Sequence, residues 1–144
     1  MSDIIDLLGT LLADTQVLAI KTQHYHWNVL GRNFFSLHQA FEDQYNEMNT
    51  EIDLIAERIR ALGSPVMGDM NTYLKQTSLE SRPVSGDDRS IVEDLITGHN
   101  GIIETLKSLI SATDAAGDKA TEDMAIKLCF DHEKVLWMLQ SFVA

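Results

Sequence analysis

The chain has 144 residues, of which 44% are hydrophobic and 23% are charged, the size and composition of a single globular domain over residues 1–144. Its formal net charge is −11, and no Lys or Arg precedes Lys21 or follows Lys134, so it lacks the cationic surface that attracts nucleic-acid phosphates, which predicts weak or absent DNA binding. No apolar run approaches the roughly 20 residues that cross a bilayer, the start has no basic signal-peptide region and Cys129 has no second cysteine to pair with, so we expect a cytoplasmic protein with no membrane partner.

Two long helices are predicted in the first half of the chain. The first runs from Asp3 to Leu30 and is followed by Gly31, a residue typical of helix ends. The second runs from Phe34 to Leu62 and stops at the turn 63–65. Both carry apolar residues at helical spacing. The positions expected to face the core are Ile4, Leu7, Leu8, Leu11, Leu12, Val17, Leu18 and Ile20, then Phe34, Leu37, Phe41, Tyr45, Met48, Ile52, Ile55, Ile59 and Leu62.

A long connection and two further helices complete the chain. The connection 63–86 has roughly two dozen residues, long for a loop, and 70–77 is predicted as a short helix within it. Asp87 or Asp88 caps a third long helix, and the stretch 115–118 separates it from a fourth. This order predicts an all-α, ferritin-like four-helix bundle with one long crossover carrying a short extra helix. The expected core positions are Ile91, Leu95, Ile102, Ile103, Leu106, Leu109 and Ile110, then Met124, Ile126, Leu128, Val135, Leu136, Leu139 and Phe142.

The residues that suggest chemistry lie on the first two helices. His26 and Trp27 come near the end of the first helix, and His38 comes early on the second. Asp53 and Glu57 lie one turn apart later on the second helix, so both can reach a single ion. Imidazole and carboxylate together form a ligand set suited to Fe²⁺, Mn²⁺ or Zn²⁺. The pattern therefore indicates a metal site.

The spacing along the second helix decides how such a site could form. His38 and Asp53 are 15 positions apart, which separates them by roughly 22 Å along a straight helix, although they lie only about 60° apart in azimuth. Two copies of this helix, packed antiparallel about a two-fold axis near Asn46 and Glu47, would bring His38 of one chain level with Asp53 and Glu57 of the other. We therefore expect two equivalent sites per dimer and none in a lone chain.

Each of these residues also has an ordinary explanation. A carboxylate pair such as Asp53 and Glu57 most often belongs to a solvated helix face, and Trp27 alone would be a core aromatic. A single histidine on a helix is usually exposed or satisfied within the core. That interpretation applies to His24, His99 and His132.

A longer pattern surrounds the candidate residues and favours the metal site over these alternatives. Its segments are Lys21-Thr22-x-x-x-His26-Trp27-Asn28-Val29-x-Gly31-x-x-Phe34-x-x-Leu37-His38, Asp53-x-x-Ala56-Glu57-Arg58-Ile59, Gly117-Asp118-x-x-Thr121-x-Asp123 and His132-Glu133-Lys134-x-x-Trp137-Met138-Leu139. In order and spacing, over essentially the whole chain, the sequence resembles the Dps family of miniferritins. The His-Trp-Asn segment and the spacing from His26 to His38 are highly specific to that family.

The resemblance implies a role for each candidate ligand. His26 and His38 would bind iron from one subunit, while Asp53 and Glu57 would come from its two-fold partner. Glu57 would bridge two irons, giving a di-iron site at each interface. Glu42, one turn beyond His38, would be the additional carboxylate that relatives often carry as Asp, and its longer side chain leaves its role open.

The resemblance also implies an assembly and a reaction. Members form hollow dodecamers, oxidise Fe²⁺ preferably with hydrogen peroxide and store ferric mineral inside. Trp27 would lie beside the site and trap oxidising equivalents. Asp118 and Asp123 are candidates for the acidic pores that admit iron, although Asp118 could equally cap the fourth helix. In relatives that condense DNA, mobile Lys/Arg-rich tails usually do so, and this sequence has no such tail.

Two other functions compete with the intersubunit ferroxidase. An oxidase with a di-iron centre inside one subunit needs Glu-x-x-His within a helix, and no histidine here has Glu three residues before it. That alternative is disfavoured. A structural or DNA-packing cage with little ferroxidase activity stays open, and iron-dependent peroxide consumption is the property that would distinguish it.

Overall fold

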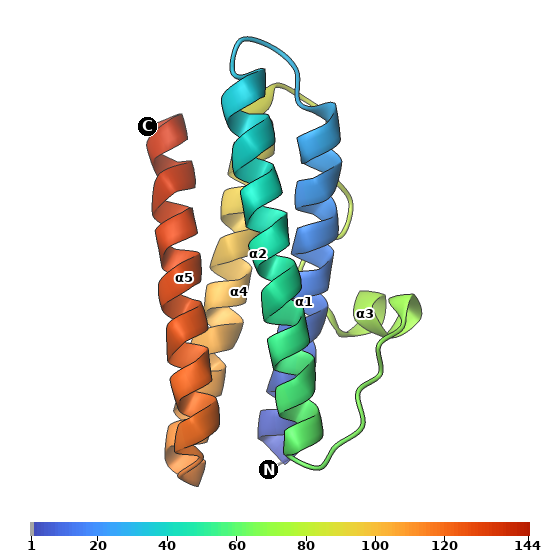
Figure 1. Ribbon diagram of the computed structural model, residues 1–144, viewed down its shortest axis with the longest axis vertical. Helices are drawn as coiled ribbons and strands as arrows, with labels where there is room; N and C mark the ends of the chain where they lie inside the picture. The colour runs from blue at the N-terminus through green and yellow to red at the C-terminus, as the bar shows by residue number, and fades with distance from the viewer. Residues whose placement is uncertain (1) are drawn as a thin grey trace.

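The computed structural model describes residues 2–144, which fold into five helices. Four long helices stand side by side, and the short helix α3 lies outside them next to α1 (Figure 1). No helix within residues 2–144 combines the length and apolar character needed to cross a membrane. The helices are α1 (Ser2–Asn28), α2 (Phe34–Ala61), α3 (Met70–Gln76), α4 (Asp88–Ala116) and α5 (Lys119–Val143).

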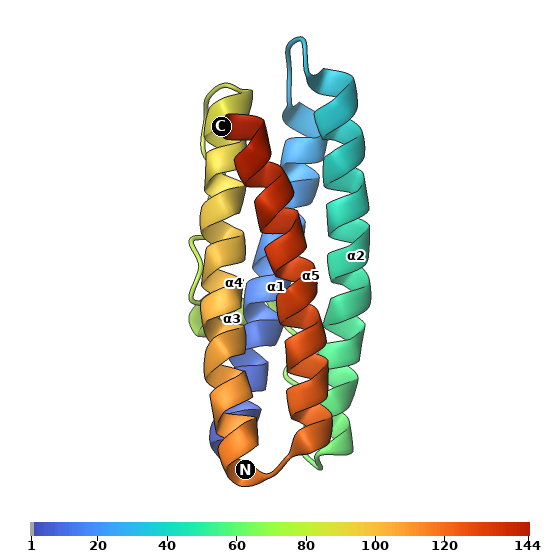
Figure 2. The same ribbon diagram turned by 90° about the vertical axis from the view of Figure 1, so that its left-hand side faces the viewer.

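The bundle consists of two helical hairpins joined by a crossover. α1 packs along α2, α4 packs along α5, and α1 also packs on α4. α2 and α5 touch at few places. In the view of Figure 2, α5 lies in front, with α4 on one side of it and α2 on the other. The connection from α2 to α4 runs the length of the bundle and carries α3 (Figure 1). The predicted all-α, ferritin-like bundle with one long crossover is therefore confirmed.

Local sequence signals set most of the helix ends. The carboxylates of Asp87 and Asp118 accept hydrogen bonds from the backbone N–H groups of Ser90 and Thr121, which have no partner inside the first turns of α4 and α5. Gly117 ends α4 in the left-handed conformation, with φ of 71°, which costs glycine little. The prediction for α1 was slightly long, because the helix ends at Asn28 rather than two residues later.

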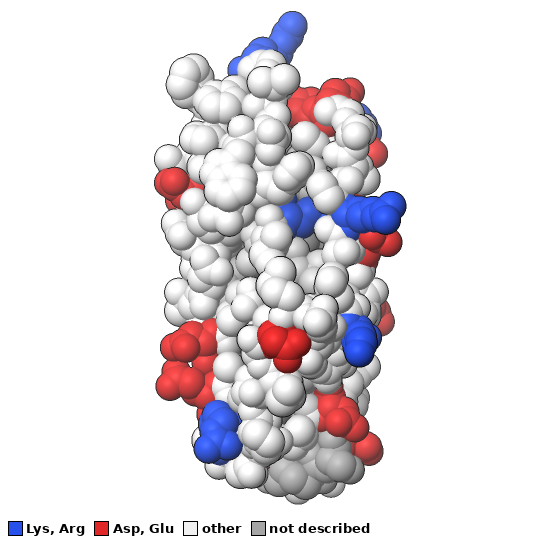
Figure 3. Space-filling view, turned by 90° about the vertical axis from the view of Figure 1, so that its right-hand side faces the viewer, with Lys and Arg blue, Asp and Glu red and all other residues white. Residues whose placement is uncertain are grey.

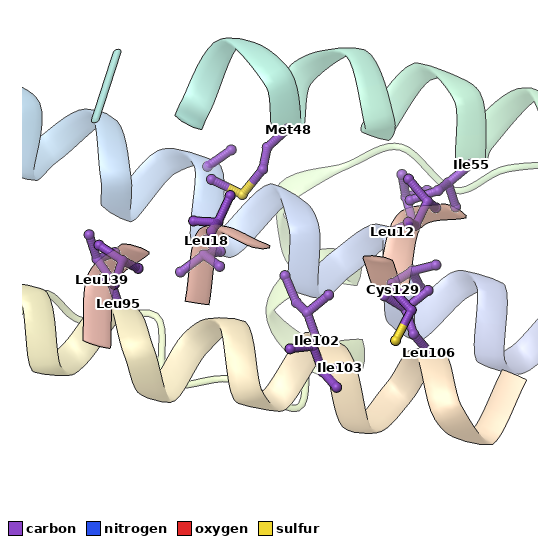
Figure 4. Close-up of a cluster of buried hydrophobic side chains, with 14 of the residues drawn as sticks. Leu12, Leu18, Met48, Ile55, Leu95, Ile102, Ile103, Leu106, Cys129 and Leu139 are labelled. Carbon is purple, nitrogen blue, oxygen red and sulfur yellow. The ribbon is translucent and has the colours of Figure 1, made fainter. Parts of the chain in front are cut away.

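The core lies between the four long helices and is almost wholly aliphatic (Figure 4). Most of the predicted core positions are buried or pack against the buried residues. Three predictions were wrong: Ile20 is 50%, Ile126 is 48% and Phe142 is 37% exposed. The sequence shows that a residue is apolar, and helical spacing shows on which face of the helix it lies. Neither shows whether the same chain covers that face.

A buried carboxylate anchors the crossover to the bundle. Asp14 on α1 is completely buried and accepts hydrogen bonds from the Thr77 hydroxyl (2.7 Å), the Ser78 backbone N–H (2.6 Å) and the Ser78 hydroxyl (2.8 Å). The Thr105 hydroxyl of α4 donates a further bond of 3.1 Å. A buried carboxylate needs such partners to offset its lost hydration, so Asp14 joins α1, α4 and the segment after α3.

Candidate metal centre

His26 and His38 meet face to face where α1 and α2 approach their connecting turn. Their ring centroids are 3.8 Å apart and the rings are tilted by only 11°. Nδ1 of His26 lies 2.6 Å from the backbone oxygen of His38, and Nδ1 of His38 lies 2.7 Å from the backbone oxygen of His26. Because a carbonyl oxygen can only accept, each Nδ1 carries the proton. In the neutral form of a ring this leaves the lone pair on Nε2, the atom that can bind a metal.

The end of α1 explains why this reciprocal arrangement forms. The last four carbonyl groups of a helix have no partner inside the helix, and the His26 carbonyl is one of them. His38 satisfies it. The ring of Phe34 stacks on His38 at 4.8 Å, and the edge of Tyr45 contacts His26 at 5.4 Å. These aromatic contacts hold both imidazoles in place.

Glu42 is the carboxylate that lies nearest to the two imidazoles. Its Oε1 is 3.8 Å from Nε2 of His26, the ring nitrogen that is not bonded to the His38 carbonyl. Helical geometry places Glu42 one turn after His38. Within one chain, the partly exposed carboxylate of Glu42 therefore lies beside His26, the imidazole that stacks on His38.

Asp53 and Glu57 form a separate group on the exposed surface of α2. A hydrogen bond between the two carboxyl groups and the charge of Asp53 raise the pKa of Glu57, because adjacent carboxylates disfavour a second negative charge. The helical rise separates this pair from His38 by roughly 22 Å or more. Within residues 2–144, no three His, Cys, Asp or Glu side chains stand where they could hold a metal ion together.

Trp27 points away from the bundle. Its side chain is 64% exposed, although its neighbour His26 is buried. The ordinary interpretation of Trp27 as a core aromatic is therefore wrong for the single chain. An exposed tryptophan beside an imidazole pair marks this end of α1 as a surface that another molecule could cover.

The two predicted pore residues differ in their surroundings. Asp118 caps α5 and also pairs with Arg58 at 3.4 Å. The Thr121 hydroxyl, which donates a bond of 2.6 Å, is the first cause that holds the pKa of Asp118 below its usual range. Asp123 is exposed one turn further along α5. The capping alternative for Asp118 is thus confirmed, and the pore role of both residues stays a prediction.

The sequence did not reveal a second polar cluster in the interior of the bundle. His132 Nε2 on α5 lies 2.6 Å from Glu51 Oε1 on α2, and its Nδ1 lies 2.9 Å from Nδ1 of His99 on α4. All three side chains are buried. The expectation that His132 is satisfied in the core is confirmed, whereas His99 Nε2 has no hydrogen-bond partner among the described residues. The sequence held one indication of this cluster. His99 and His132 each follow a predicted core leucine by four residues, which places each histidine on the same helix face as that leucine.

Comparisons with known proteins identify the family. The family model for the ferritin-like domain matches residues 5–144. A low temperature-induced protein of Nostoc sp. is 38% identical over 144 residues, covering 97% of this chain and 79% of that protein. DNA protection during starvation protein 2 of Bacillus anthracis is 33% identical over 140 residues, covering 97% of this chain and 96% of that protein.

A solved structure agrees with these relatives. The Dps protein of Vibrio cholerae O1, described as a member of a broad superfamily of ferritin-like diiron-carboxylate proteins, superposes with a TM-score of 0.95 at 31% identity, covering 99% of this chain and 90% of that one. The likeness extends over the full bundle, including the helices that carry both candidate ligand groups. The chain belongs to the Dps family of ferritin-like proteins, the iron-storage miniferritins.

Proposed function

We propose that the protein is a ferroxidase miniferritin whose iron sites form between two chains. One observation carries the proposal: the end of α1 together with the start of α2 carries one group of candidate ligands, and a second group lies further along α2, too far away to act with the first within one chain. The His26, His38 and Glu42 group lies at one end of the helix, and the pair Asp53 and Glu57 lies about four turns away. Antiparallel pairing of two α2 helices would complete two sites at once.

The surface near the first half supports contact with another chain. Ile20 and Trp27 are seven residues apart on α1, which places them on one face, and both are exposed. Ile20 also lines a hollow of about 100 Å³ together with Met70 and Leu74 of α3. The side of the molecule that carries α3 shows broad uncharged areas between scattered charges (Figure 3). Exposed apolar surface of this kind is typical of protein–protein contacts.

The proposed reaction follows from the chemistry of the ligands. Nε2 of His26 and of His38 would bind Fe²⁺ from one chain, and the carboxylates of Asp53 and Glu57 from the other, with Glu57 shared between two irons. Oxygen ligands favour Fe³⁺, so the site promotes loss of an electron. Two Fe²⁺ would each give one electron to hydrogen peroxide, which takes up two protons and leaves as two water molecules. Trp27 would lie close enough to intercept oxidising equivalents.

The product would be stored in a closed assembly. We infer a hollow homododecamer in which ferric ions leave the oxidation sites and accumulate as mineral. The single cysteine of the sequence fits a reducing compartment, so we place the assembly in the cytoplasm. The net charge of −11 per chain favours attraction of Fe²⁺, and Asp118 and Asp123 are the candidate lining of its pores. The same charge opposes binding to DNA.

The substitution His38→Ala tests the ligand assignment. It removes one Nε2 ligand and releases the His26 carbonyl, so we expect peroxide-dependent Fe²⁺ oxidation to be abolished, measured by the ferric absorbance. His24→Ala is the matched control, because His24 lies on the same helix as His26 but outside the stacked pair. Native mass should show both variants assembled. Normal oxidation by an assembled His38→Ala variant would show that the ligand assignment is wrong.

The competing function is a cage with little ferroxidase activity. Anaerobic titration with Fe²⁺, followed by addition of peroxide, separates the two. A ferroxidase consumes about one peroxide for every two Fe²⁺ bound, as the electron balance requires, whereas an inert cage shows no iron-dependent consumption.

A further inference from the structure

The intersubunit site leaves a buried polar cluster unused in the middle of the bundle. Glu51 on α2, His132 on α5 and His99 on α4 form a row, here called the polar row, with contacts of 2.6 Å and 2.9 Å between neighbours. Within residues 2–144, α2 touches α5 at few places and does not pack directly on α4. The polar row therefore reaches from α2 to two helices that α2 otherwise contacts little.

Two buried polar atoms beside the polar row have no hydrogen-bond partner within residues 2–144. They are His99 Nε2 and Gln44 Oε1. His99 is 1% and Gln44 is 8% exposed, and both residues line one cavity. A buried polar atom without a partner destabilises the fold, so we expect each of these atoms to have one. A single partner inside the cavity could serve both atoms.

The cavity restricts its occupant by size and by chemistry. Its volume of about 10 Å³ holds one water molecule, and a hydrated ion or an organic molecule would exceed it. None of the described residues that line it is Lys or Arg, so no long basic side chain fills the space. The carboxylate of Glu51 lines the same cavity and adds a third polar group. An internal water typically has roughly two to four such partners.

A water molecule fits either position of the His99 ring proton. Burial, followed by the influence of His132, holds the pKa of His99 well below its usual value, so the ring carries one proton. With that proton on Nδ1, where it is donated to His132, a water would donate to Nε2. With the proton on Nε2, the ring would donate to the water. In both cases the water donates its other hydrogen to Gln44 Oε1, so the fit does not depend on the charge of His132.

We propose that one internal water molecule binds in this cavity and bridges His99 Nε2 to Gln44 Oε1. The water closes a hydrogen-bonded ring that leaves α2 at Glu51, passes through His132 and His99, and returns to α2 at Gln44. Glu51 and Gln44 are seven residues apart, which places them two turns apart on one face of α2. The closed ring thereby fixes how that face of α2 is turned toward α4 and α5. The water site forms within one chain and does not rest on the proposed ferroxidase activity.

A high-resolution crystal structure of the wild-type protein tests the water site directly. We expect one isolated density peak per chain, within hydrogen-bond distance of both His99 Nε2 and Gln44 Oε1. A cavity without such a peak would overturn the proposal. A direct hydrogen bond between the Gln44 amide and His99 would overturn it as well, because the two side chains would then satisfy each other.

A matched pair of substitutions tests the same site in solution. Gln44→Met keeps most of the side-chain volume but removes the amide oxygen, so the variant should lose one slowly exchanging internal water per chain, counted by relaxation dispersion of the solvent. Gln140→Met is the control, because Gln140 is an exposed glutamine on α5, and it should keep the wild-type count. An unchanged count in folded Gln44→Met would show that the proposal is wrong. The wild-type density peak decides the question alone if Gln44→Met fails to fold.

Discussion

His26 and His38 fix each other's proton positions, and this is the residue-scale feature on which iron binding would depend. Each Nδ1–H donates to the other residue's carbonyl oxygen. Both rings therefore keep the proton on Nδ1, which leaves Nε2 as the nitrogen that would bind iron. The sequence could predict both histidines as candidates. It could not predict their reciprocal bonds, because these need the turn between α1 and α2 to place the unpaired His26 carbonyl opposite the His38 ring.

The buried row of Glu51, His132 and His99 escaped sequence analysis for a related reason. Glu51 and His132 are 81 positions apart, and each alone is an ordinary polar residue on an amphipathic helix. Only the packing of α2, α4 and α5 shows that they meet. The candidate ligands of the proposed intersubunit site could be named from the sequence because family-specific residues surround them, and their role stays a prediction.

Asp118 gives a pH-dependent prediction at the residue scale. Replacing it with Ala leaves the Thr121 N–H without its cap and should lower the free energy of unfolding by about 1 kcal/mol at neutral pH. The folded-state pKa of Asp118 is lowered, so its contribution is complete above the usual aspartate pKa of about 4 and is lost as the pH falls through the folded-state value.

Thermal unfolding of the wild type and Asp118→Ala at several pH values measures this difference. The two midpoints should differ at pH 7 and converge as the pH falls through the lowered pKa of Asp118. Asp123→Ala, an exposed aspartate on the same helix, should behave like the wild type throughout. A gap between wild type and Asp118→Ala that widened in acid would contradict the capping account.

At the scale of elements, apolar periodicity and capping residues predicted the number and order of the helices. The helix ends agree within one or two residues, because Gly117, Asp87 and Asp118 carry clear local signals. The errors fall on apolar residues that the single chain leaves exposed, such as Ile20 and Ile126. Their spacing matches the buried positions of the same helices, and only the structure shows that no part of the chain within residues 2–144 covers them.

The crossover provides an element-scale prediction. Asp14→Ala would remove the acceptor of the Ser78 backbone N–H and of the Thr77, Ser78 and Thr105 hydroxyls. These bonds are the polar contacts that tie the segment after α3 to α1. The crossover after α3 should therefore loosen, and hydrogen exchange at the Ser78 amide should accelerate far more than exchange in the middle of α4. Unchanged protection at Ser78 would show that Asp14 does not anchor the crossover.

At the scale of the whole molecule, the negative net charge favours attraction of Fe²⁺ and opposes binding to DNA. The net charge is −11, and the segments before Lys21 and after Lys134 contain no Lys or Arg, so these segments offer phosphates no cationic partner. We expect no mobility shift of duplex DNA at neutral pH and physiological salt. A variant extended by a short Lys-rich tail is the matched control and should shift DNA in a salt-dependent manner. A strong shift by the unmodified protein would contradict this prediction.

Sharing of each iron site between two chains is tested most directly by mixing two inactive proteins. His38→Ala chains keep their carboxylates, and Asp53→Ala/Glu57→Ala chains keep their imidazoles. When the two are co-assembled in equal amounts, half of the dimers should be mixed, and each mixed dimer should contain one intact site. Peroxide-dependent Fe²⁺ oxidation should then recover to about a quarter of the wild-type level. Co-assembled chains that remain as inactive as either parent would contradict a site built from two chains.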